Sequence, residues 1–341
     1  MTPHQKKITN KLKYVQILVW ILMVPTFILT TTWSAAALWI DVSVSRILAI
    51  LMSCVFVLAA IGNVIYVRPY LRALWIHLAM FLSVVTWWLM IPAQDNRDWL
   101  KDVACVPRTT LEGDLLTIYH LRNFEYRSTV DYTERWEKRT YDLGKLRSLD
   151  MFLVYWGDPK IAHPIFSWGF DDGRFLAISI ETRKEKGETY STTLGFFRQF
   201  ELYYVVADER DVIRLRTHHR GEQVFLYRMN APVAKIRGLL EAYLNQINAL
   251  AETPQWYNAL SHNCTTMVHY HNRSTGGQLS WNWRIILNGY LDEYLHENNL
   301  LKGNLPFKEL RKKSFINEQA QACKNIAEFS KQIREGLWED K

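Results

Sequence analysis

The stretch "NALSHNCTTMVHYHN" at residues 258–272 gathers residue types that carry chemistry: one cysteine, Cys264, with His262, His269 and His271 close by. A cysteine in such a setting is a metal ligand, half of a disulfide, a buried structural residue or a nucleophile. The histidines do not fall at the i, i+4 spacing of a helical ligand pair, and the chain has no CxxC motif here. We therefore expect no metal at this stretch.

The residues around Cys264 favour the nucleophile. In "SHNCTT", Ser261 or Asn263 is a suitable N-cap, which places Cys264 in the first turn of a helix. The free N–H groups and the dipole of that turn favour the thiolate and can also bind an oxyanion. We assign Asn263 to substrate binding next to Cys264. A structural cysteine remains the alternative.

A thiol nucleophile needs a base, and His163 at the start of "HPIFSWGF" is the candidate. The following "GFDDGRF" suits a hairpin with a three-residue loop and glycine in the left-handed position. In that register His163 lies opposite Glu181, whereas a two-residue loop places Thr182 there. The resulting hypothesis is a catalytic Cys264–His163–Glu181 arrangement, in which the carboxylate orients the imidazole.

The remaining cysteines leave the pairing open. Cys54 lies within an apolar run and reads as a small apolar residue. Cys105 lies just after the last apolar run and Cys323 near the C-terminus, so a bridge between them would tie the ends of the external domain together and leave Cys264 unpaired. The sequence does not determine this connectivity.

The first part of the chain has the pattern of a membrane anchor. Long apolar runs occupy residues 14–40, 47–67 and 73–93, and each is long enough as a helix to cross the hydrocarbon layer. Lysines precede the first run and arginines separate the second from the third, which predicts a cytoplasmic N-terminus. We therefore expect an anchor at 1–93 and an external domain at 94–341, in the periplasm if the chain is bacterial.

Charge excludes a nucleic-acid-binding face. The net charge is +7, but residues 1–95 hold seven basic and two acidic residues, which leaves 34 basic and 32 acidic residues in the rest. The external part reads as one α+β domain with mostly antiparallel strands. Strands are expected at 115–128, 135–143, 148–157, 163–170, 174–182, 200–208 and 223–229. Helices are expected at 208–219, 231–252, after Asn263, across 281–299 and near the C-terminus.

Four blocks of this domain carry a resemblance. "FSWGFDDGRFLAISIETRKEKGETYS", "RQFELYYVVADERDVIRLRT", "YNALSHNCTT" and "WNWRIILNGYLDEYL", within residues 148–300, resemble the Lnb N-terminal periplasmic domain family. The resemblance implies a circularly permuted papain-like (NlpC/P60-like) thiol fold, with Cys264 as nucleophile and His163 as base. It also implies lipoprotein N-acylation at a bacterial inner membrane: transfer of an acyl chain from a phospholipid through a thioester to the terminal amine of a lipoprotein.

These observations lead to one main hypothesis and two alternatives. We expect a membrane-anchored thiol acyltransferase without a cofactor, whose partners are a phospholipid donor, a lipoprotein acceptor and the membrane, with no nucleic acid. Arginines suit phosphate headgroups, and we assign Arg183, Arg198 and Arg214 to substrate binding. The alternatives are a cell-wall peptidase or amidase of the NlpC/P60 type and a non-enzymatic envelope scaffold. A peptidase calls for an open polar groove, whereas an acyltransferase calls for an apolar slot.

Overall fold

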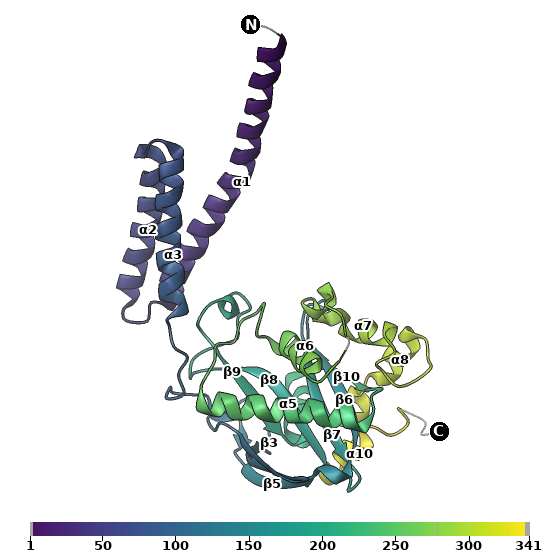
Figure 1. Cartoon of the computed structure of the whole chain (residues 1–341). Coiled ribbons are helices and arrows are strands. Elements are labelled where there is room, and N and C mark those ends of the chain that lie inside the picture. The colour runs from purple at the N-terminus through teal and green to yellow at the C-terminus, as the bar shows by residue number, and fades with distance from the viewer. Residues whose placement is uncertain (1–2, 278, 338–341) are drawn as a thin grey trace. The chain divides into compact units, whose positions relative to one another are not determined.

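The computed structural model describes residues 3–277 and 279–337, and only the backbone of residues 3–20 (Figure 1). The chain divides into two compact units. The first holds the N-terminal helices as far as Pro92 together with Phe197–Gln199, and the second holds Ala93–Phe196 and the chain from Phe200 onward.

Three long helices form most of the first unit: α1 (Pro3–Asp41), α2 (Arg46–Tyr66) and α3 (Tyr70–Leu89). Each contains a segment long and apolar enough to cross a membrane, at Ile21–Asp41, Arg46–Tyr66 and Tyr70–Leu89. Large apolar side chains on all three remain exposed, among them Leu29, Ile47 and Trp75. Exposed apolar surface of this extent suits contact with lipid. The third helix ends at Leu89, four residues before the predicted end of that span at residue 93.

The second unit is an α/β domain built on one large mixed sheet, ordered β1-β2-β9-β8-β7-β6-β10, with β5 paired to β2. All pairs in it are antiparallel except β2–β9, which are parallel at Arg122 and Ala207. A small second sheet pairs β3 with β4. The strands are β1 (Arg108–Glu112), β2 (Leu115–Arg122), β3 (Glu125–Tyr126), β4 (Tyr132–Thr133), β5 (Trp136–Asp142), β6 (Leu146–Tyr155), β7 (Ala162–Phe170), β8 (Phe175–Arg183), β9 (Glu201–Ala207) and β10 (Gln223–Arg228).

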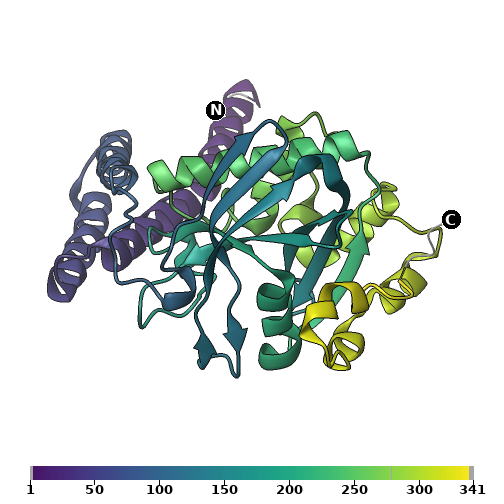
Figure 2. The ribbon, with the colours of Figure 1, turned by 90° about the horizontal axis from the view of Figure 1, so that it is seen from below.

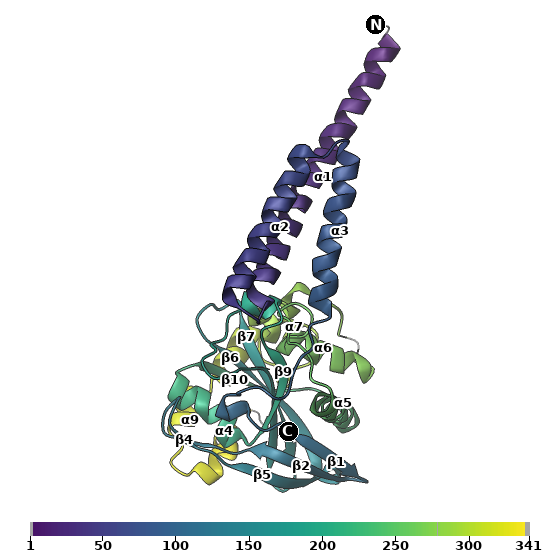
Figure 3. The ribbon, with the colours of Figure 1, turned by 90° about the vertical axis from the view of Figure 1, so that its left-hand side faces the viewer.

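Helices cover both faces of this sheet, as Figures 2 and 3 show. On one face α5 and α6 pack on strand residues such as Phe166 and Ile178. On the other face, α4 (Glu209–Arg214) and the C-terminal helices pack on Ile165 and Ala177, which directly precede Phe166 and Ile178 in their strands. Successive strand residues point to opposite faces, so a doubly covered sheet needs near-continuous apolar strands. Every residue of β7 is accordingly buried.

The helices of this domain begin with α4 (Glu209–Arg214), which continues as a π-helical turn at Leu215–Arg220. The others are α5 (Val233–Glu252), α6 (Cys264–Ser274), α7 (Leu291–Glu297), α8 (Phe307–Ser314), α9 (Asn317–Gln321) and α10 (Phe329–Gln332). Short 3₁₀ turns lie at Lys101–Val103, Leu143–Lys145, Leu194–Phe196, Trp283–Ile285, Asn288–Tyr290 and Ile326–Glu328.

The helix predicted across 281–299 is broken, and only Leu291–Glu297 is α-helical. The break is explained by Gly289, whose N–H donates to the carbonyl oxygen of Lys160 over 2.9 Å. A Cβ on Gly289 would lie 2.2 Å from the carbonyl oxygen of Pro159. The backbone here approaches another loop more closely than a regular helix with side chains allows.

The β7–β8 hairpin has the predicted three-residue loop. The N–H of Phe170 donates to the carbonyl of Arg174, and Gly173 has a φ of 79°. The strands pair in the same register, with Ile165 opposite Ser179. That register brings His163 to the level of Glu181, as the hairpin prediction required.

Candidate functional site

Cys264 is the first residue of α6, and Asn263 is its N-cap. The side-chain oxygen of Asn263 accepts hydrogen bonds from the N–H groups of Thr265 and Thr266, each over 2.9 Å. Thr266 returns the contact, since its hydroxyl accepts from the N–H of Asn263 over 2.9 Å. This capping box uses two N–H groups of the first turn but not the N–H of Cys264. The half-buried thiol therefore lies at the first residue of the helix, next to a backbone N–H, that of Cys264 itself, which the cap does not use.

His163 and Glu181 lie side by side on the β7–β8 hairpin. The imidazole Nε2 is 3.1 Å from the Oε1 atom of Glu181 and 2.6 Å from the hydroxyl of Ser179. That hydroxyl donates to the same Glu181 oxygen over 2.7 Å. Because Nε2 faces these acceptors, Nδ1 is the ring nitrogen left to face the thiol of Cys264, whose interaction with His163 raises the pKa of the imidazole.

Glu181 is held as a carboxylate. Burial raises its pKa, but the charges of His163 and Arg216 and the hydrogen bonds from His163 and Ser179 hold that pKa well below its usual range. Arg216 lies on the π-helical turn and reaches the Oε1 atom over 2.8 Å. Arg216 is therefore a component of this cluster that the sequence analysis did not identify.

The imidazole of His163 is biased toward its charged form. Burial lowers its pKa, but the Glu181 carboxylate and the hydrogen bond with Cys264 outweigh burial and raise the pKa to about 9. At neutral pH the base is therefore an imidazolium, and a cation next to the sulfur stabilises the thiolate. The cluster can supply a nucleophile and a proton donor from one pair of side chains.

Asn288 is a member of the site that sequence reasoning missed. Its side-chain oxygen accepts from the N–H of Ala162 over 2.8 Å. Its Nδ2 donates to the hydroxyl of Thr265 over 2.6 Å and lies 3.8 Å from the sulfur of Cys264. One side chain thus ties the start of the His163 strand to the start of the Cys264 helix. The signal was an asparagine–glycine pair inside an otherwise apolar stretch, where a helix was expected.

The three histidines near Cys264 in sequence contact other partners. His271 is buried, bonds through Nε2 to the hydroxyl of Tyr204 over 2.7 Å, and has a pKa lowered to about 4 by burial. His269 packs on Trp281 with ring centroids 5.7 Å apart. Nδ1 of His262 lies 2.9 Å from the hydroxyl of Ser261. Within residues 3–277 and 279–337, no three His, Cys, Asp or Glu side chains converge as metal ligands.

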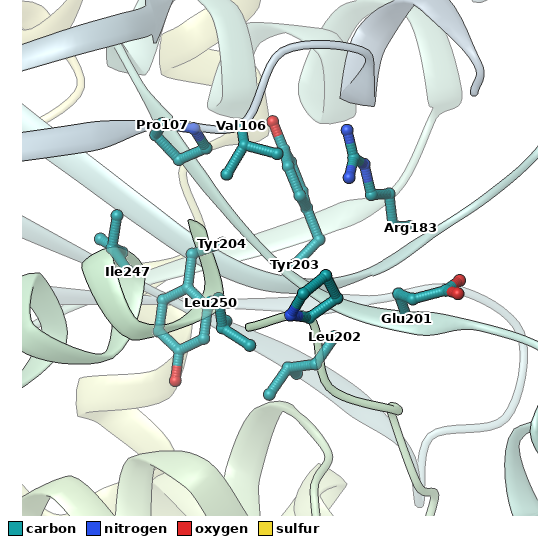
Figure 4. Close-up of a pocket in the computed structure, with 10 residues that line it drawn as sticks. Val106, Pro107, Arg183, Glu201, Leu202, Tyr203, Tyr204, Ile247 and Leu250 are labelled. Atoms are coloured by element: carbon teal, nitrogen blue, oxygen red, sulfur yellow. The ribbon is translucent and has the colours of Figure 1, made fainter. Parts of the chain in front are cut away.

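Arg183, one of the arginines assigned to substrate binding, is held by contacts of its own. Arg183 is buried, pairs with Asp95, donates to the carbonyl of Val103 over 3.0 Å and stacks over Trp99 at 4.1 Å. It also lines a cavity of about 20 Å³ together with Glu201 (Figure 4). That volume suits about one water molecule rather than a headgroup.

The other two arginines assigned to substrate binding, Arg214 and Arg198, lie on other parts of the chain. Arg214 ends α4, where its positive charge lowers the pKa of His218 after the larger effect of burial. Arg198 belongs to the first unit and stacks over Trp88 at 4.2 Å. Asn263, also assigned to substrate binding, directly precedes Cys264 as the N-cap of α6.

The bridge considered between Cys105 and Cys323 is absent, because all four cysteines are unpaired. The carbonyl of Cys105 accepts from the hydroxyl of Tyr203 over 2.6 Å. The sulfur of Cys323 lies 3.2 Å from the carbonyl of Asn325. Burial raises the pKa of both thiols. Cys264 is therefore distinguished by its neighbours rather than by being the odd cysteine.

Together, these features define an α/β domain with a cysteine–histidine–carboxylate cluster, in a chain whose N-terminal helices are able to span a membrane. Residues 132–289, which hold all three members of the cluster, match the model of the Lnb N-terminal periplasmic domain family. Family and helices together indicate a membrane anchor followed by a periplasmic domain. No curated protein and no solved structure matches the chain.

Proposed function

We propose that this protein is a thiol acyltransferase that moves an acyl chain from a phospholipid to the terminal amine of a lipoprotein through a thioester on Cys264. The observation that carries the proposal is the Cys264–His163–Glu181 cluster at the N-terminus of α6. The order of base before nucleophile fits a permuted papain-like fold. The match to a periplasmic domain family supports action at the outer face of a bacterial inner membrane, and we propose a cytoplasmic N-terminus.

In the first half-reaction the Cys264 thiolate attacks the ester carbonyl of the lipid. The tetrahedral oxyanion forms next to the N–H of Cys264 and the Nδ2 of Asn288, which are positioned to stabilise it. The carbon–oxygen ester bond then breaks, and the leaving lysolipid oxygen takes the proton of the His163 imidazolium. The products are an acyl thioester and a lysophospholipid.

In the second half-reaction the amine attacks the thioester carbonyl. His163, now neutral, takes the proton from the attacking nitrogen, and Glu181 stabilises the imidazolium that forms. The carbon–sulfur bond breaks, which regenerates the thiolate and leaves an amide on the lipoprotein. The arrangement returns to its starting protonation state without a cofactor.

The test is an adduct assay on the full chain in detergent micelles with phospholipid. Mass spectrometry should find an acyl group on Cys264 that hydroxylamine removes. Cys264→Ser and His163→Ala should abolish it, whereas Cys323→Ser, which removes another half-buried thiol, should leave it intact. If wild-type protein forms no adduct and instead cleaves peptidoglycan fragments, the cluster serves a cell-wall peptidase and the acyltransferase proposal is wrong. If neither reaction occurs, the proposal is equally wrong.

A further inference from the structure

An apolar cavity of about 190 Å³ lies in the second unit, between α5, α6 and α7 and over the inner face of β6 and β7. Its walls include Phe166 from the sheet, Ile236 and Leu239 from α5, and Leu295 from α7. Figure 1 shows α5 and α6 adjacent in front of the sheet. The cavity is separate from the small one that Arg183 lines.

This cavity reaches the candidate site through α6. Thr265 lines it, and the hydroxyl of the same residue is 3.8 Å from the sulfur of Cys264. Val268 lines it one helical turn beyond Cys264, on the same side of the helix, since residues four apart are neighbours there. Cys264 and Val268 also pack against one hydrophobic core cluster. A group attached to the sulfur and directed along this side of α6 would meet the cavity.

Size and lining specify what fits. An apolar cavity of about 150 Å³ stays dry and takes up a benzene-sized molecule. A cavity of about 190 Å³ therefore suits a hydrocarbon segment of roughly six to eight carbons, by the same measure. The lining is mainly apolar, with walls such as Leu239 and Leu295, and has some polar side chains such as Lys235. Most polar groups of a peptide or sugar would therefore lack partners there.

We propose that this cavity binds the hydrocarbon chain of the acyl group while that group is held as a thioester on Cys264. The inference rests on the proposed function and adds to it a binding site and a chain-length preference. The carbonyl would stay beside Asn288, and the carbons after it would pass Thr265 toward Val268. Burying these carbons stabilises the acyl-enzyme and keeps its chain from the solvent.

The test uses p-nitrophenyl esters with acyl chains of 2 to about 16 carbons and follows the burst of p-nitrophenolate from the full chain in micelles. For wild-type protein the acylation rate should rise from acetyl to a chain of about eight carbons. Val268→Trp should lower the rate for the eight-carbon ester about 10-fold or more while changing the acetyl rate less than about 2-fold. Tyr270→Trp is the matched control, because Tyr270 is 61% exposed on the same helix, and it should change neither rate.

Val268→Ala enlarges the cavity and should move the preferred chain to a greater length, which keeps the test informative if the tryptophan variant does not fold. Equal rates for all chain lengths in wild-type protein, or an unchanged preference in Val268→Ala, would overturn the cavity proposal even if Cys264 is acylated. Failure of the proposed function gives a different result, since Cys264 would then form no adduct with phospholipid, whatever its chain-length preference for these esters.

Discussion

Replacing Glu181 with glutamine tests the electrostatics of the cluster directly. The substitution keeps the shape of the side chain but removes the negative charge that raises the pKa of His163 against the effect of burial. With that charge the pKa of His163 is about 9, against an ordinary value of 6.5. The difference corresponds to about 3 kcal/mol at about 1.4 kcal/mol per unit of pKa. Without the charge, burial lowers the pKa, and only the contact with Cys264 still raises it.

The expected result is that His163 loses its proton at a lower pH. In wild-type protein the His163 imidazolium should persist until it loses its proton near pH 9. In Glu181→Gln that loss should occur about 2 pH units lower or more. The ester acylation rate, which needs both members of the pair, should therefore have its alkaline limb moved down by the same interval.

Two measurements check this shift. The first is the pH profile of p-nitrophenyl ester acylation. The second is iodoacetamide alkylation of Cys264, followed by mass spectrometry on the peptide that contains it, because alkylation reports the thiolate without a substrate. At pH 6 the variant should be alkylated at least about 10-fold more slowly than wild-type protein.

Glu297→Gln is the matched control, because Glu297 also pairs with an arginine, Arg284, over 2.7 Å, but half of its side chain is exposed. It should leave both profiles unchanged. If Glu181→Gln leaves the alkaline limb and the alkylation rate at pH 6 where they are in wild-type protein, the carboxylate does not set the charge of His163, and the reasoning fails.

Three further predictions concern the surroundings of the pair. Asn288→Ala should reduce the acylation rate about 100-fold, the usual cost of losing one oxyanion donor, while iodoacetamide alkylation of Cys264 falls much less; equal losses in both assays would contradict a role at the oxyanion. Gly289→Ala should lower the melting temperature, since its Cβ would lie 2.2 Å from the carbonyl oxygen of Pro159, and an unchanged melting temperature would contradict that contact. The raised pKa of His163 contributes stability below about pH 6.5 that is lost as the pH rises through about 9, so the melting temperature of wild-type protein relative to His163→Ala should fall across that interval; a constant difference would show that the pair contributes no such stability.

Local patterns predicted the parts of the site that depend on neighbours in sequence. The hairpin register followed from the Asp-Asp-Gly loop, because loop length fixes which residues face each other. The start of α6 at Cys264, with Ser261 or Asn263 as its cap, followed from the preference of helix starts for short polar side chains, and Asn263 is the residue that caps it. Both predictions are confirmed.

Features that depend on distant packing were not predictable. Asn288 acquires its position from contacts with Ala162 and Thr265, which are far from it in sequence. The strand β1 was missed because "RTTLE" is mostly exposed and lacks a clear apolar alternation. The sequence left the pairing of Cys105 and Cys323 open, because cysteine counts carry no information about which sulfurs meet, and the structure leaves both unpaired.

The β7–β8 hairpin also has a consequence for the order in which the site is assembled during folding. A three-residue turn joins the two strands, so bringing His163 and Glu181 together costs little chain entropy. Cys264 follows His163 by about 100 residues, and closing so long a loop is slower and costs more entropy. The pair of base and carboxylate is therefore expected to form first, and the thiol to dock later against a partner that is already oriented. A defect in the late docking step would leave a folded hairpin with an intact histidine–carboxylate pair and an unreactive cysteine.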